Sequence, residues 1–95
     1  MDELLAIPFI NNRLRHWQVR LNTSERLEEK AREALQSAAL HLANQAASGG
    51  TIALAMKEVQ HHTRVVMHYE RTIQHCKRRL AHYSERLRIE TAAEG

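Results

Sequence analysis

The sequence is poor in residues that break helices, form cross-links or favour strands. Its 95 residues include one proline, three glycines, one cysteine and four aromatic side chains. A single cysteine excludes an internal disulfide framework and is typical of a reducing, cytoplasmic setting. Few glycines and aromatic residues, set against abundant Ala, Leu, Glu, Arg and Gln, predict an all-α protein.

Long apolar runs and targeting signals are lacking as well. No segment has the roughly eighteen consecutive apolar residues that suggest a membrane span. The opening stretch, MDELLAIPF, has acids where a secretion signal has basic residues. We therefore expect a cytoplasmic protein that does not insert into membranes. Its formal net charge is +3 with histidine neutral, a modest basic bias.

One break divides the chain. In the segment NQAASGGT, residues 44–51, two adjacent glycines follow a helical run and Thr51 stands where it can cap the next helix. Asn22, followed by Glu25, also has the pattern of a helix start, so the first helix is either continuous or broken near residue 22. The predicted divisions are an N-terminal segment over 1–8, with or without a short helix of its own, helix 1 over 9–47, a turn over 48–51, helix 2 over 52–90 and a disordered tail over 91–95.

Both helical segments repeat apolar residues every seven positions. The first core row of helix 1 is Leu14, Leu21, Leu35 and Leu42, and its second core row is Ile10, Trp17, Ala31 and Ala38. Helix 2 has a first core row of Ile52, Val59, Val66, Ile73, Leu80 and Leu87, and a second of Ala55, His62, Tyr69, Cys76 and Tyr83. These rows predict one domain, a long antiparallel helical hairpin resembling a coiled coil, that packs on a partner or on a second copy. Folding at the glycines puts small core residues near the turn and bulky ones at the open end.

Histidine also recurs every seven residues in helix 2, at His61, His68, His75 and His82. Neighbours in this row are about 10.5 Å apart along a helix, too far to share one zinc ion. The row is therefore either a solvated polar flank or a surface that responds to pH or to anions.

A tighter group near the turn, His41, Glu58 and His62, offers weak candidates for metal ligands, but a plain hydrogen bond between histidine and glutamate across the interface explains it better. We predict no bound metal and no cofactor.

Catalytic patterns are missing from the chain. The one aspartate is Asp2, close to the N-terminus, and Cys76 lies in a core row, where it is better explained as a small packed side chain than as a nucleophile. No glycine-rich phosphate loop, paired cysteine motif or HExxH is present. The chain is therefore predicted not to be an enzyme.

Basic residues crowd the open end of the predicted hairpin. The eight that fold together are Arg13, Arg15, Arg20, Lys77, Arg78, Arg79, Arg86 and Arg88. In this register Arg20 faces Arg79 and Arg13 faces Arg86, like-charge pairs that an anionic partner would relieve. The cluster is interpreted either as a nucleic-acid or anion surface, or as a solvated face that at most binds acidic proteins.

A second set of residues is apolar but lies outside the core rows. Its members are Val19, Leu27, Leu40, Met56, Val65 and Met67. Two helices alone cannot cover them all, so they predict an interface with another protein or with a second copy.

Three stretches carry a resemblance to a known family: HWQVRL at 16–21, ERLEEKAREAL at 25–35 and HYERTIQHCKRRLAHYSERL at 68–87. In residue type and order they resemble the C-terminal helical region of PriC, the bacterial primosomal replication protein N″. PriC proteins are longer, and ASGGT resembles an insertion. The resemblance implies a non-enzymatic replication-restart factor that contacts single-stranded DNA, single-strand-binding protein and the replicative helicase. Its matching basic positions are Arg32, Lys77 and Arg86.

Two functions remain open from the sequence. The first is a protein-interaction module, an adaptor, co-chaperone or assembly factor that binds a partner helix or self-associates. The alternative is a PriC-like factor that binds single-stranded nucleic acid through its basic end.

Overall fold

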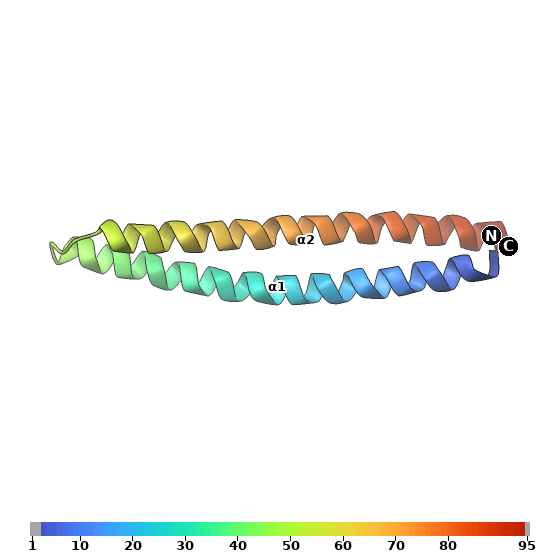
Figure 1. Cartoon of the computed structure of the whole chain (residues 1–95), viewed down its shortest axis with the longest axis horizontal. Coiled ribbons are helices and arrows are strands. Elements are labelled where there is room, and N and C mark those ends of the chain that lie inside the picture. Colours follow the sequence, from blue (N-terminus) through green and yellow to red (C-terminus); the bar gives the residue numbers. More distant parts are fainter. Residues whose placement is uncertain (1–2, 95) are drawn as a thin grey trace.

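The chain folds as a hairpin of two long antiparallel helices (Figure 1). The computed structural model describes the backbone of residues 3–94 and the side chains of residues 5–94. Helix α1 spans Glu3–Ala47 and helix α2 spans Ala53–Glu94. The molecule measures 70 × 18 × 14 Å, so it is a rod. The predicted all-α hairpin is confirmed, and residues 3–94 contain no strand.

The helices are longer than the sequence predicted. Helix α1 begins at Glu3, so the separate segment over 1–8 is wrong for the described residues 3–8. Pro8 lies inside α1, where it removes one backbone hydrogen bond, yet the helix continues because Ala6 and Ile10 on either side are buried. Helix α2 continues to Glu94, so residues 91–94 are helical instead of disordered, and Gly95 lies outside the described residues.

The possible break near residue 22 does not form. Asn22 accepts a hydrogen bond from the Gln18 side chain at 2.9 Å, Nε2 to Oδ1, so its oxygen has a partner within the same helix. Ser24 is buried in line with the second core row of α1. A continuous α1 keeps that row in register on both sides of residue 22, which a break there would interrupt.

The turn follows from the glycine pair. Gly49 has a φ of 75°, the left-handed conformation that glycine adopts without steric cost. The Gly50 amide donates to the Gln45 carbonyl at 2.9 Å, and the Gly49 amide donates to the Ala46 carbonyl at 3.3 Å. These two bonds make a Schellman motif, which ends α1 and turns the chain back. Ile52, not Thr51, accepts the first backbone bond of α2, from the Met56 amide at 2.8 Å.

The core is a single seam between the helices. The buried apolar side chains from the predicted rows are Ile10, Trp17, Leu21, Ala31, Ala38, Ala55, Val66, Ile73, Cys76 and Tyr83. Large side chains form one cluster in the half of the rod away from the turn, whereas the core nearer the turn relies on alanine. The predicted gradient from small to bulky core residues is thus confirmed.

We predict that Ile10→Ala lowers the free energy of unfolding by about 2–5 kcal/mol, because truncating a fully buried isoleucine leaves a cavity. Ile10 is 0% exposed and contacts no solvent. Urea unfolding followed by far-UV circular dichroism measures the change. Ile89→Ala removes the same atoms from a side chain that is 51% exposed and should change stability by only about 0.5 kcal/mol. Equal losses of unfolding free energy in the two variants would contradict the burial of Ile10 in the seam.

Candidate functional site

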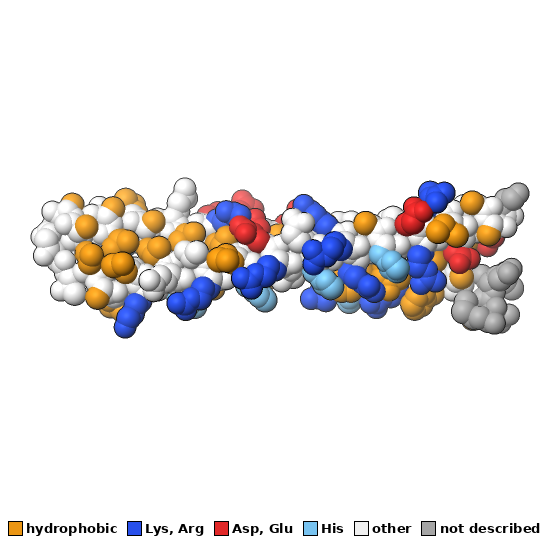
Figure 2. Space-filling view, turned by 90° about the horizontal axis from the view of Figure 1, so that it is seen from above, with side chains coloured by type: hydrophobic (Ala, Val, Ile, Leu, Met, Phe, Trp, Pro, Cys, Tyr) orange, Lys and Arg blue, Asp and Glu red, His pale blue; other side chains and the backbone are white. Residues whose placement is uncertain are grey.

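One long face of the hairpin is basic. Residues one position before and two positions after the first core row point to the same side of each helix, and these sides meet along one face of an antiparallel pair. Six of the seven histidines and five of the fourteen Lys and Arg residues fall at these positions. Glu58, near the turn, is the one acid at these positions in the part of the chain that the structure describes. Figure 2 shows histidine side chains along one edge of the rod with Lys and Arg among them.

We call this surface the arginine–histidine face. In the half of the rod away from the turn, its members are Arg13, His16 and Arg20 of α1 and His75, Arg79, His82 and Arg86 of α2.

Three of these arginines gather around the buried indole of Trp17. The guanidinium carbon lies 5.0 Å from the ring centroid for Arg20, 5.6 Å for Arg79 and 5.7 Å for Arg13. Arg79 and Arg13 also lie over the Tyr83 ring, at 5.1 and 5.8 Å. The negative faces of the two rings attract the cations, which explains how like charges from both helices come together here.

Contact with the rings also restricts the guanidinium groups. A planar guanidinium held against an aromatic surface loses less rotational freedom when its N–H groups bind an anion. Trp17 and Tyr83 are each only 6% exposed, so the rings support the arginines and have little surface left for other contacts. The Trp17 Nε1 atom is buried and has no hydrogen-bond partner in the structure.

Tyr83 and Arg79 are linked directly. Arg79 Nη2 donates a hydrogen bond to Tyr83 Oη at 2.9 Å. Hydrogen bonding from Arg13, together with the positive charges of Arg79 and Arg13, holds the pKa of the Tyr83 phenol below its ordinary value of 10.0. Two guanidinium groups therefore act on one phenol oxygen.

Histidines line the same face. The rings of His16 and His75 meet Trp17 edge to face, at centroid distances of 5.1 and 5.2 Å, and His75 comes from the opposite helix. His82 contacts Tyr83 in the same way at 5.0 Å. The four histidines spaced by seven residues are all exposed. The row thus lies on the basic face, where its exposed rings fit a solvated flank as well as an anion-binding surface.

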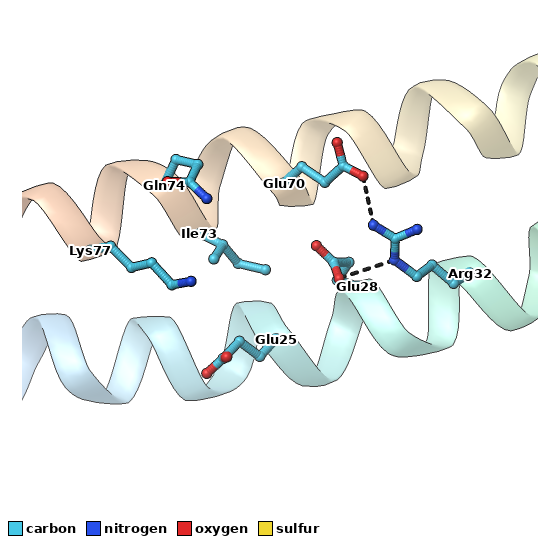
Figure 3. A pocket seen from close by; sticks show the side chains of 7 residues that line it. All are labelled: Glu25, Glu28, Arg32, Glu70, Ile73, Gln74 and Lys77. Atoms are coloured by element: carbon cyan, nitrogen blue, oxygen red, sulfur yellow. Dashed lines mark hydrogen bonds and ion pairs between the residues drawn. The ribbon is translucent and has the colours of Figure 1, made fainter.

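The opposite face contains a mixed-charge cluster. Arg32 of α1 donates through Nε to Glu28 Oε1 at 3.1 Å and through Nη2 to Glu70 Oε1 of α2 at 2.6 Å. Figure 3 shows the three side chains turned toward one another beside a cleft that Lys77 also lines. Hydrogen bonds and charge from Glu28, and secondarily Glu70, raise the pKa of Arg32. The Arg32 and Glu70 side chains are about half exposed, so the bridge fixes register more than it adds stability.

The structure divides the predicted basic cluster between two surfaces. Arg13, Arg20, Arg79 and Arg86 share the arginine–histidine face. Lys77 lines the cleft on the opposite side, and Arg88 is paired with Glu85 at 2.6 Å. Arg15 and Arg78 are exposed at positions outside the arginine–histidine face. Only four of the eight predicted basic residues therefore share one face. Histidines, which the prediction treated separately, lie on that face with them.

The predicted apolar interface is exposed but scattered. Val19, Leu27, Leu40, Met56 and Met67 are exposed, and Val65 is half-buried. Their spacing from the core rows puts them on several flanks, so they do not form one continuous surface.

The end of the rod at the turn has a clearer apolar surface. Residues 34–56 contain no Lys, Arg, Asp or Glu, and we call this segment the uncharged tip. Exposed side chains of Leu40, Ile52, Leu54 and Met56 lie within it. Figure 2 shows this end as apolar and uncharged. The run of 23 uncharged residues was the sequence signal for this surface, and the seven-residue spacing did not reveal it.

The weak metal candidates are not supported. Among the described residues no three His, Cys, Asp or Glu side chains are placed to hold a metal ion, so His41, Glu58 and His62 do not form a metal group. Cys76 is fully buried in the seam, as its place in the core row predicted. Neither helix has, within residues 3–94, an apolar stretch sufficient to cross a membrane.

Comparison with known proteins finds no matching family model, no matching curated protein and no matching solved structure.

We predict that Tyr83 ionises below pH 10 because the two arginines stabilise its phenolate. Absorbance at 295 nm in a Tyr69→Phe background reports Tyr83 alone. Adding Arg13→Gln should move the transition to higher pH. The linked gain in stability is fully present above the ordinary value of 10.0 and is lost as the pH falls through the lowered value. A transition that Arg13→Gln leaves unmoved would contradict this placement of the guanidinium.

Proposed function

We propose that this chain is a non-enzymatic helical module that binds single-stranded nucleic acid along its arginine–histidine face. The observation that carries the proposal is the group of three arginines, from both helices, around one buried indole. In the paired segments 13–24 and 73–84 there is no acid, so no carboxylate competes with an incoming phosphate. Guanidinium groups bind phosphate oxygens with two parallel hydrogen bonds.

The contacts favour backbone over base recognition. Trp17 and Tyr83 are packed in the seam and offer little ring surface on which a base can stack. Binding through phosphates alone is independent of sequence and sensitive to salt. We therefore expect little preference among oligonucleotides of equal length.

The resemblance to PriC supports the same proposal. It implies a replication-restart factor that contacts single-stranded DNA, single-strand-binding protein and the replicative helicase. Of its three matching basic positions, Arg86 is on the arginine–histidine face, Lys77 lines the opposite cleft, and Arg32 bridges two glutamates. Arg86 is thus the best placed of the three to bind an anion. The single free cysteine and this resemblance also support a bacterial, cytoplasmic setting.

We predict that a fluorescent single-stranded oligonucleotide binds with an affinity that falls steeply with salt. If the four arginines of the face each neutralise one phosphate, the slope of log K against log salt is about −3. Arg20→Gln combined with Arg79→Gln should halve that slope and weaken binding roughly tenfold or more at about 0.1 M salt. Fluorescence anisotropy at several salt concentrations measures both quantities.

The matched control is Arg26→Gln with Arg71→Gln. It removes the same charge from exposed positions on the outer sides of the two helices, away from the face. This pair should keep most of the affinity, because local phosphate contacts and not net charge determine binding. Equal losses of affinity in both pairs, with helicity unchanged, would mean that net charge and not the face attracts the oligonucleotide. Binding that does not change with salt would overturn the proposal.

A second function is favoured by the exposed apolar residues: a protein-interaction module that binds a partner helix or self-associates. Leu54 and Leu40 are 69% and 63% exposed, far more than leucine in a packed core. We expect the mass measured by light scattering to rise above 11.0 kDa with concentration and to be insensitive to salt. A monomer at every concentration would remove the self-association part of this proposal.

A further inference from the structure

We infer that two copies of the chain associate through their uncharged tips, residues 34–56. The inference rests on the second proposed function and names its surface and its partner. It is independent of nucleic-acid binding, which uses the other half of the rod.

The tip exposes apolar surface that its own fold cannot cover. Leu40, Ile52, Leu54 and Met56 are between 40% and 69% exposed within a short length of the rod. The core beneath them is built on Ala38 and Ala55, which are buried. Ile52 is in the first core row and is still 40% exposed, and Leu40, Leu54 and Met56 lie outside both core rows, so the monomer leaves all four side chains uncovered.

The tip is also a well-defined surface. Two Schellman hydrogen bonds end α1, and the Ser48 hydroxyl donates to the Gln45 carbonyl at 3.1 Å. Gly49 has the left-handed backbone that the turn requires. Bonds within the turn therefore fix the backbone from which Leu40, Ile52, Leu54 and Met56 extend, so little backbone entropy is lost when this end of the rod is covered.

Charge distribution identifies a second copy as the partner. In a two-fold symmetric contact the same patch meets itself, so any charge near the symmetry axis meets a like charge. The arginine–histidine face is strongly basic and would repel its own copy. The tip has no Lys, Arg, Asp or Glu over 23 residues, and His41 is its one titratable side chain. Alongside residues 34–40, however, α2 carries Lys57 and Glu58, so the end of the rod that is uncharged on both helices is residues 41–56. This end can pair with itself without contacts between Lys, Arg, Asp or Glu side chains.

The shape of such a dimer differs from that of a bundle. Residues 41–47 of α1 make an uncharged end about 10 Å long. Two rods of 70 Å that overlap by this length give a particle of roughly 130 Å. Two hairpins packed side by side along their whole length would instead stay near 70 Å.

The test combines light scattering for mass with small-angle X-ray scattering for length. We expect a concentration-dependent dimer, twice 11.0 kDa, with a maximum dimension well above 70 Å. Leu40→Gln with Leu54→Gln should weaken it at least tenfold and leave helicity unchanged, since glutamine is a good helix former. The matched control, Val19→Gln with Met67→Gln, changes residues of the rod body that are 58% and 43% exposed and should remain dimeric.

Each other outcome overturns the inference in a distinguishable way. We call Leu40→Gln with Leu54→Gln the tip pair, and Val19→Gln with Met67→Gln the body pair. If the body pair dissociates the dimer and the tip pair does not, or if the length of the dimer stays near 70 Å, the chain self-associates through another surface. The second function then stands. A monomer at every concentration removes self-association itself. If the monomer instead floats with phosphatidylcholine vesicles and the tip pair does not, the tip binds a lipid surface. Oligonucleotide binding by the tip pair is expected to equal that of the unchanged chain, so the nucleic-acid proposal is tested separately.

Discussion

The structure depends on one seam, because two helices have only one line along which they can bury apolar side chains. Ile10 and Cys76 are fully buried in it, and the large side chains around them hold the half away from the turn. The register of this seam decides every contact between the helices. A slip of one heptad would separate Arg79 from the Trp17 ring and Arg32 from Glu70, although each helix would still present apolar rows to the other.

The basic face follows from that register. Arginines on the flanks of two antiparallel helices are brought together because the same flank of each helix meets its counterpart. Three guanidinium groups near one ring repel each other, and the repulsion is reduced by solvent on one side and by the ring faces of Trp17 and Tyr83 on the other. An anion bound there would remove the repulsion. In the proposed complex, stability and binding would thus be linked, since the arginines that repel one another in the free hairpin would attract a phosphate.

The two halves of the rod have different chemistry. Bulky core residues and surface arginines occupy the half away from the turn, where the seam is well packed. The tip has an alanine core and carries its large apolar residues on the outside. The small core buries few apolar side chains at the tip, and the proposed self-association would cover those that are exposed. The arginines proposed to bind nucleic acid and the tip proposed for self-association lie in different halves of the rod, so a dimer would present two arginine clusters at opposite ends.

The sequence by itself determined the helical class, the turn at the glycine pair and the core rows, because seven-residue spacing and glycine conformation are local properties of the chain. It misplaced the helix ends. Pro8 and the pattern at Asn22 are weak local signals, and a buried seam on both sides of each overrides them. Only the tertiary structure decided how the charges combine. Arg13 is far in sequence from Arg79 and Tyr83, yet it contacts the Tyr83 ring. Lys77 and Arg88 are close to Arg79 and Arg86 in sequence, yet they lie on other sides of α2. Spacing within one helix specifies the side of that helix on which a residue lies. Packing between the helices decides which sides meet and which residues lie at the same level along the rod.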